Sequence, residues 1–176
     1  MDVRFITPDL PQLDTLRSEA LSAAFFEDER PLRGALGRVD WRLCGQLSRL
    51  LLQGRIDGRI GERVLVPVRR KLPFEKLFLF GLGPRADFDD ARMGDALDVM
   101  LTVLDRARVR ASALVLPGRS LSLIAPVLAM ETFLRVAATH PEHDEVTLVE
   151  EAEAHKDMLP VVERERRRAR ALVPQG

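Results

Sequence analysis

The stretch that decides the fold reads QGRIDGRIGE at residues 53–62 and LFLFGLGPR at residues 77–85. Residues 77–80 are apolar without interruption, which is typical of a strand covered on both faces. The strand stops at a Gly-x-Gly turn over residues 81–83, and many α/β domains place such a turn at a ligand-binding edge. The stretch therefore predicts an α/β domain with a loop at one edge of its sheet.

The rest of the chain alternates predicted strands and helices. We expect strands over residues 3–6, 20–26, 64–68, 76–80, 113–116 and 145–149. Helices are expected over residues 39–53, from a cap at Asp87 to about 104, over 122–138 and over 158–172. Strands that alternate with helices of this length imply a three-layer α/β/α domain with a mixed, mostly parallel central sheet.

Composition favours one globular domain over residues 1–176, with 46% hydrophobic and 31% charged residues. Basic and acidic residues both number 27, so no overall charge favours nucleic acid or an acidic membrane surface. Cys44 is the only cysteine, and no leader or membrane-spanning run is recognisable. We therefore expect a cytoplasmic protein with neither nucleic-acid nor membrane partners.

The ordered motifs resemble the N-terminal domain of the cytosolic leucyl aminopeptidase family, the dizinc M17 peptidases. The resemblance is carried by Gly34, Asp40, GQLS at 45–48, the two stretches quoted above, and RARALVP at 168–174. The tail is similar to the segment that joins this domain to the catalytic domain, although Ala171 stands where the family usually has Asp. The resemblance implies a macro-domain-like fold that helps to organise a hexamer. In related macro domains, loops at the C-terminal ends of the strands bind ADP-ribose.

The resemblance also implies that the chain is not an enzyme, because the family's zinc ligands and its catalytic lysine and arginine belong to the other domain. The sequence itself offers no convergent set of carboxylates for two metal ions, and we expect no cofactor or metal. The leading hypothesis is a non-catalytic domain that self-associates or binds a protein partner. The alternative is a module that binds ADP-ribose or another phosphate-bearing small molecule. A third hypothesis is that the chain is an excised piece of a full aminopeptidase.

Two strand-end turns are the candidate phosphate-binding loops, since their backbone N–H groups and arginines could cradle an anion near a helix N-terminus. The candidate residues are Gly81, Gly83, Arg85, Gly118, Arg119 and Ser120. The competing interpretation is two tight turns that need glycine for their geometry and carry solvated arginines.

Five further features have a structural and a functional interpretation. Residues 27–30 and 140–145 offer metal-compatible side chains, but their spacing favours solvated surface loops. Cys44 is expected to be a small buried side chain on a helix, and Trp41 a packing residue that could also anchor an interface. The arginines of residues 164–170 favour a solvated helix end over a nucleic-acid site, because Glu163 and Glu165 lie beside and among them and no aromatic residues interleave.

Overall fold

The computed structural model describes residues 1–68 and 70–171, whose strands form one mixed six-stranded sheet. The strands are β1 (Asp2–Ile6), β2 (Ala20–Phe25), β3 (Arg63–Pro67), β4 (Lys76–Gly81), β5 (Ala111–Leu114) and β6 (Glu145–Val149). Their order is β1-β6-β5-β2-β4-β3. Every neighbouring pair is parallel except β3 with β4, so the predicted mixed, mostly parallel sheet is confirmed.

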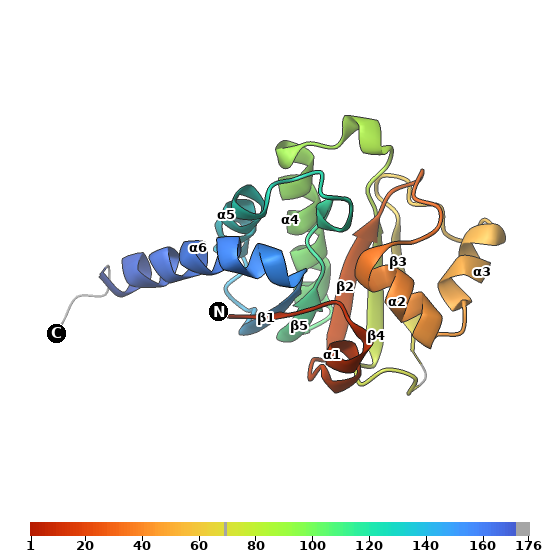
Figure 1. The fold of residues 1–176 in the computed structure, drawn as a ribbon, viewed down its shortest axis with the longest axis horizontal. Coiled ribbons are helices and arrows are strands. Elements are labelled where there is room, and N and C mark those ends of the chain that lie inside the picture. The colour runs from red at the N-terminus through yellow and green to blue at the C-terminus, as the bar shows by residue number, and fades with distance from the viewer. Residues whose placement is uncertain (69, 172–176) are drawn as a thin grey trace.

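Helices cover both faces of the sheet (Figure 1). They are α1 (Leu10–Thr15), α2 (Gly34–Arg42), α3 (Gln46–Leu52), α4 (Asp90–Arg106), α5 (Pro126–Ala137) and α6 (Ala152–Ala171). One hydrophobic cluster joins α4, α5 and α6 to the sheet, and a second joins α1, α2 and α3 to it. The predicted three-layer α/β/α architecture is therefore correct.

Strand β4 shows how the sequence dictates these layers. Leu77 and Leu79 point into the cluster under α1 to α3, whereas Phe78 and Phe80 point into the cluster under α4 to α6. Successive side chains of a strand face opposite sides of the sheet, so an unbroken apolar run is buried twice. All four side chains are indeed buried.

The helix expected over residues 39–53 is two helices, and this corrects the prediction. The chain breaks between α2 and α3 at Cys44 and Gly45, which have φ angles of +56° and +75°. The Asp40 carboxylate then accepts hydrogen bonds from the N–H groups of Leu47 and Ser48, at 2.7 and 3.2 Å. Asp40 thereby caps the first turn of α3 from the preceding helix and replaces the bonds that the break removes.

Strand β5 covers Ala111–Leu114, where a strand over residues 113–116 was predicted. Three helix starts also differ from the prediction. Asp89, not Asp87, caps α4, because its side chain accepts from the Arg92 N–H. Helix α5 begins at Pro126, where the missing N–H costs nothing, and α6 begins at Ala152 with Pro160 inside it. The predicted end of α6 at residue 172 lies outside the described residues, and the short helix α1 was not predicted.

Candidate functional site

The two turns proposed as phosphate loops lie at the same edge of the sheet, because they follow the parallel strands β4 and β5. An aromatic ring occupies the space between them. A Cβ added at Gly118 would lie 2.5 Å from Cε1 of Phe88, which follows the first turn. Phe88 also packs edge-on against Phe26 at the end of β2, with ring centroids 5.0 Å apart. The two turns are therefore bridged by packed rings.

The glycines of the first turn pack directly against the QGRIDGRIGE loop. A Cβ at Gly81 would lie 2.0 Å from the carbonyl oxygen of Arg59, and the N–H of Gly83 donates to the Gly58 carbonyl at 2.8 Å. Gly58 has a φ of +85°, and a Cβ there would lie 2.7 Å from the backbone of Phe26. These glycines serve close backbone packing. We call residues 57–62 and 81–83 the glycine clasp.

The Glu62 carboxylate holds the loop side of the glycine clasp in shape. It accepts hydrogen bonds from the N–H of Asp57 and, at 2.7 Å, from the N–H of Gly58. A buried or half-buried backbone N–H needs such a partner when no strand supplies one. The final Glu of the motif is thus a structural acceptor.

Arg85 of the first turn is bound to an acidic side chain. Its Nε donates to Asp28 at 2.9 Å, and its backbone N–H donates to the same carboxylate at 3.2 Å. The hydrogen bond from Arg85 lowers the pKa of Asp28 below its usual value. The positive charge of Arg85, which was expected to bind an anion, is therefore already paired with the Asp28 carboxylate in this structure.

Arg119 of the second turn is held more completely. Its Nε and Nη2 donate to the two oxygens of Glu150 at 2.9 and 3.2 Å, and Nη1 donates to the Ile124 carbonyl at 2.5 Å. The two side chains of the pair are only 9% and 5% exposed. Such a bidentate pair satisfies most of the guanidinium donors.

A cavity of about 440 Å³ lies beside this pair at the strand-end edge. Gly34 and Ser120 line it, and a Cβ on Gly34 would come within 3.0 Å of the Ser120 Cβ. The charged lining residues are Arg119, Glu150, Glu151, Glu153 and Asp157. Four carboxylates against one paired guanidinium give this cavity a negative lining, which opposes a phosphate.

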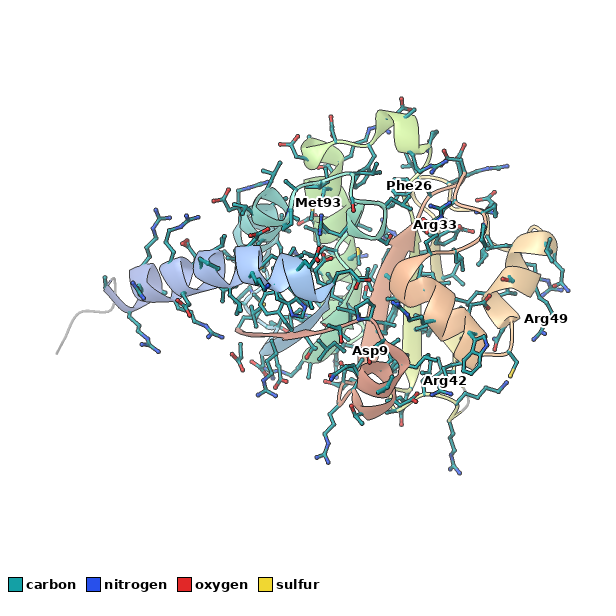
Figure 2. The ribbon with its side chains drawn as sticks, in the orientation of Figure 1. Asp9, Phe26, Arg33, Arg42, Arg49 and Met93 are labelled. Atoms are coloured by element: carbon teal, nitrogen blue, oxygen red, sulfur yellow. The ribbon has the colours of Figure 1, made fainter. Side chains whose placement is uncertain are left out.

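The loop at residues 27–30 is less solvated than expected. Glu29 is buried, and its carboxylate accepts hydrogen bonds from the N–H groups of Phe26 and Arg33, both labelled in Figure 2. Burial raises the pKa of Glu29 above its usual value, although the two backbone hydrogen bonds act against it. Glu29 ties the end of β2 to the start of α2.

The expectation of a surface loop at residues 140–145 is wrong for its two histidines. His140 and His143 are buried and share the Asp105 carboxylate of α4, at 2.5 and 3.1 Å. The second nitrogen of His143 lies 3.1 Å from Ser112 Oγ, and that of His140 lies 3.2 Å from Asp98. The partners are distant in the sequence, so local spacing did not reveal them.

The inner part of this histidine cluster is closed to solvent. Ser112 and His143 are each 1% exposed. Within the described part of the chain, no group of three or more His, Cys, Asp or Glu side chains is placed to hold a metal ion. The arrangement is suited to fixing the loop between α5 and β6 onto α4.

Cys44 and Trp41 are exposed, contrary to the expectation that both pack inside. The helix break removes Cys44 from the helical face, and its Sγ lies 3.5 Å from Lys71 Nζ. Trp41 is 65% exposed, with the Arg42 guanidinium carbon 5.2 Å from its ring. The arginines of residues 164–170 lie on an exposed helix end, as predicted.

The chain matches a known protein family over more than half of its length. Residues 23–133 match the model of the cytosol aminopeptidase family, N-terminal domain. This chain belongs to that family. A probable cytosol aminopeptidase of Geobacter sp. strain M21 is 36% identical over 102 residues, covering 56% of this chain and 20% of the relative. The probable cytosol aminopeptidase of Thermosynechococcus vestitus is 27% identical over 147 residues, which cover 82% of this chain and 29% of the relative.

This member of the family therefore spans less than a third of the length of these relatives. The probable cytosol aminopeptidase of Synechocystis gives the same picture, with 30% identity over 105 residues that cover 21% of its length. The matched region is the N-terminal domain of the family. In residues 1–68 and 70–171, no helix is both long and apolar enough to cross a membrane.

Solved structures show the same fold at low sequence identity. A tomato leucine aminopeptidase mutant superposes with a TM-score of 0.60 at 12% identity, covering 90% of this chain and 35% of that chain. The Trypanosoma brucei macrodomain in complex with ADP-ribose superposes with a TM-score of 0.70 at 12% identity, covering 91% of this chain and 68% of that chain. The domain is thus macrodomain-like in fold.

Proposed function

We propose that this domain is non-catalytic and works by binding protein, either a second copy of itself or a separate partner. The observation that carries the proposal is a set of large apolar side chains exposed on α2, α3 and the chain around β3. Their exposed fractions are 65% for Trp41, 87% for Leu52, 65% for Ile60 and 55% for Leu65. Leu65 lies opposite Phe78 and so projects to the side of the sheet covered by α4 to α6, whereas Trp41 stands on α2 on the other side. Exposed Trp in particular is enriched at interaction sites.

The edge strand β3 supports the same proposal. It pairs with β4 on one side and stands at the end of the strand order, so its other side has no strand partner in the described structure. A cavity of about 380 Å³ adjoins it, with Ile60, Phe88 and Val99 in the lining. An open strand edge beside an apolar groove suits addition of a strand from another protein.

A pull-down and a size measurement test this proposal. The tagged chain is immobilised and exposed to a lysate of its source organism, and the purified chain is sized by light scattering. We expect a retained protein or a self-associated species, and we expect Leu65→Lys to weaken it because a lysine on an edge strand opposes pairing. Val127→Lys on α5, at a side chain 42% exposed, is the matched control.

The outcome that would count against the proposal is a monodisperse monomer that retains no protein. If Leu65→Lys leaves the complex or oligomer intact, the protein-binding role stands and β3 is not part of the binding surface.

Binding of ADP-ribose or another phosphate-bearing small molecule is the second candidate. Its support is the fold shared with a macrodomain solved with ADP-ribose. The paired arginines and the acidic cavity lining weigh against it, because a pyrophosphate would have to displace Asp28 or Glu150. We expect neither heat in calorimetry nor a rise in Tm at millimolar ADP-ribose. A saturable one-to-one isotherm with a matching rise in Tm would place this candidate first.

A further inference from the structure

The cavity of about 380 Å³ that adjoins β3 is a groove along the first half of α4. Its apolar lining residues are Ile60, Phe80, Leu82, Phe88, Ala96 and Val99. Phe80 and Leu82 are buried and form a closed floor, whereas Ile60 is exposed at the open side. A concave apolar surface of this size is the usual form of a small-molecule site. We call it the α4 groove.

The walls of the α4 groove are held in place by packing. A Cβ added at Gly83 would lie 2.6 Å from Cγ1 of Ile60, so the isoleucine is seated directly on this glycine. Phe88 is fixed in the same way between Gly118 and Phe26, as described above. A preformed site loses little conformational entropy when a ligand enters, and this favours binding.

The charged lining residues give the α4 groove an excess of positive charge. They are Glu62, Arg63, Arg92 and Asp95. The Glu62 carboxylate is already bound by N–H groups of the glycine clasp. Arg63 stands opposite Phe80 in the β3–β4 register, so its side chain projects to the same side of the sheet as the floor. The groove thus has two guanidinium groups against one remaining carboxylate, that of Asp95.

The guanidinium of Arg92 is the polar group that points to a ligand. Its Nη1 is shielded from solvent and has no hydrogen-bond partner in the described part of the chain. The Asp87 carboxylate lies 3.9 Å away, which is beyond hydrogen-bonding distance. An arginine N–H without an acceptor costs free energy that a bound acceptor recovers. The side chain as a whole is 41% exposed, so the guanidinium can turn towards such an acceptor without disturbing the core.

We propose that the α4 groove binds a small apolar carboxylic acid, with its hydrocarbon part on Phe80, Leu82 and Val99 and its carboxylate on Arg92. The two oxygens of a carboxylate match the planar fork of a guanidinium. A phosphate is disfavoured because it would bring about two negative charges close to Asp95. The volume suits a chain of about eight carbons.

This site goes beyond the protein-binding function proposed above and does not depend on it. The α4 groove shares no lining residue with the acidic cavity beside Arg119, among the residues that the structure describes. The two hollows therefore differ in place and in the charge of the ligand that each favours.

Calorimetry with three probes of equal chain length tests the site. The 176-residue chain is titrated at neutral pH with octanoate, 1-octanol and octylamine. We expect saturable one-to-one binding of octanoate with a Kd of about 1 mM or lower, and a matching rise in Tm. The alcohol lacks the charge and the amine reverses it, so each should bind at least about tenfold more weakly.

Variants of the lining separate the charge from the apolar contact. Arg92→Met keeps the side-chain stem and removes the charge, so it should weaken octanoate about tenfold and leave 1-octanol unchanged. Arg92→Lys restores the charge without the fork and should recover part of the loss. Ala96→Phe fills the groove and should weaken both probes. Arg55→Met, at an exposed arginine after α3 and outside the groove, is the matched control and should change nothing.

Four results would overturn this proposal. They are no saturable octanoate binding up to about 5 mM, equal binding of the three probes, wild-type binding by Arg92→Met, and wild-type binding by Ala96→Phe. Far-UV circular dichroism confirms folding of each variant, and the comparison of probes on the wild-type chain needs no variant. Failure here leaves the protein-binding function standing, because that function is measured by the pull-down and by Leu65→Lys.

Discussion

Arg119 and Glu150 form a bidentate ion pair that joins the loop after β5 to the end of β6, with side chains 9% and 5% exposed. The pair stands where two neighbouring parallel strands end. Its two charges are removed from water together, so each depends on the other. The pair is therefore part of the framework of this edge.

Removing one member of the pair should be strongly destabilising. We expect Arg119→Met to lower the free energy of unfolding by about 3–5 kcal/mol, because Glu150 is left as an uncompensated buried charge. Urea denaturation followed by circular dichroism measures the change. Arg119→Met combined with Glu150→Met should recover most of the loss, since no charge then remains buried.

The exposed pair of Arg85 and Asp28 is the natural control for that measurement. Arg85→Met should lower the free energy of unfolding far less, because solvent screens this pair. Equal losses for Arg85→Met and Arg119→Met would contradict the framework role of the buried pair.

Gly81→Ala should be among the most destabilising substitutions in the domain. The added Cβ would lie 2.0 Å from the Arg59 carbonyl oxygen and 2.6 Å from the Gly58 carbonyl carbon, so backbone must move. We expect a loss of about 3 kcal/mol or more. Gly94→Ala in α4 is the matched control, because its Cβ would meet only side chains at 3.6 and 3.7 Å. Alanine there should stabilise by about 0.4–1 kcal/mol. Similar effects at both glycines would refute the packing argument.

Asp105 should give the domain part of its resistance to acid. Burial acts to raise the pKa of Asp105, but hydrogen bonds from His140 and His143 outweigh it and leave the pKa below 3.8. Its contribution is present above that unfolded value and is lost as the pH falls through the lowered pKa. Asp105→Asn should therefore be less stable than wild type near neutral pH, with the two curves converging in acid.

Denaturation midpoints measured from neutral to acidic pH check this expectation. Asp98→Asn removes the more exposed partner of His140, whose side chain is 60% exposed, and should have a smaller effect. Parallel stability curves for wild type and Asp105→Asn would show that the shared carboxylate does not act in this way.

The contribution of Glu29 to stability should have the opposite pH dependence from that of Asp105. Because burial raises its pKa above 4.5, the folded state binds the proton more tightly than the unfolded state. The stabilisation is complete below pH 4.5 and is lost as the pH rises through the raised pKa. Glu29→Gln should therefore lose less stability than wild type between acidic and neutral pH. Urea titrations across that range measure the difference, with Glu27→Gln, an exposed neighbour, as the control. If the free energy of unfolding changes equally with pH in wild type and in Glu29→Gln, this contribution is ruled out.

The fold was predictable because its main signals are local. The run at residues 77–80 fixes a strand buried on both faces, and the strand Glu145–Val149 was predicted with the bounds it has in the structure. The division of the helix at Gly45 was missed because its cause is not local. Asp40 replaces the lost hydrogen bonds from seven and eight positions away, so the apolar period continues across the break.

The candidate site was less predictable, because its character depends on pairs that are distant in the chain. The sequence placed Arg119 beside a Gly turn, and nothing near it indicated that Glu150 would neutralise it from the next strand. His140 and His143 find Asp105 on another helix in the same way. Glu62 accepts from N–H groups of its own motif, so its role depends on local contacts, although no role was predicted for it.

The glycine clasp also bears on how mutational scans of this domain are interpreted. At Gly81 and Gly58 any side chain overlaps main-chain atoms, so every replacement is expected to score as damaging. In a selection for function, these positions would look as intolerant as the active-site residues of an enzyme. Intolerance at this sheet edge therefore identifies steric contact between two backbones, and a search for binding residues is better directed at positions where substitutions leave the folded state intact.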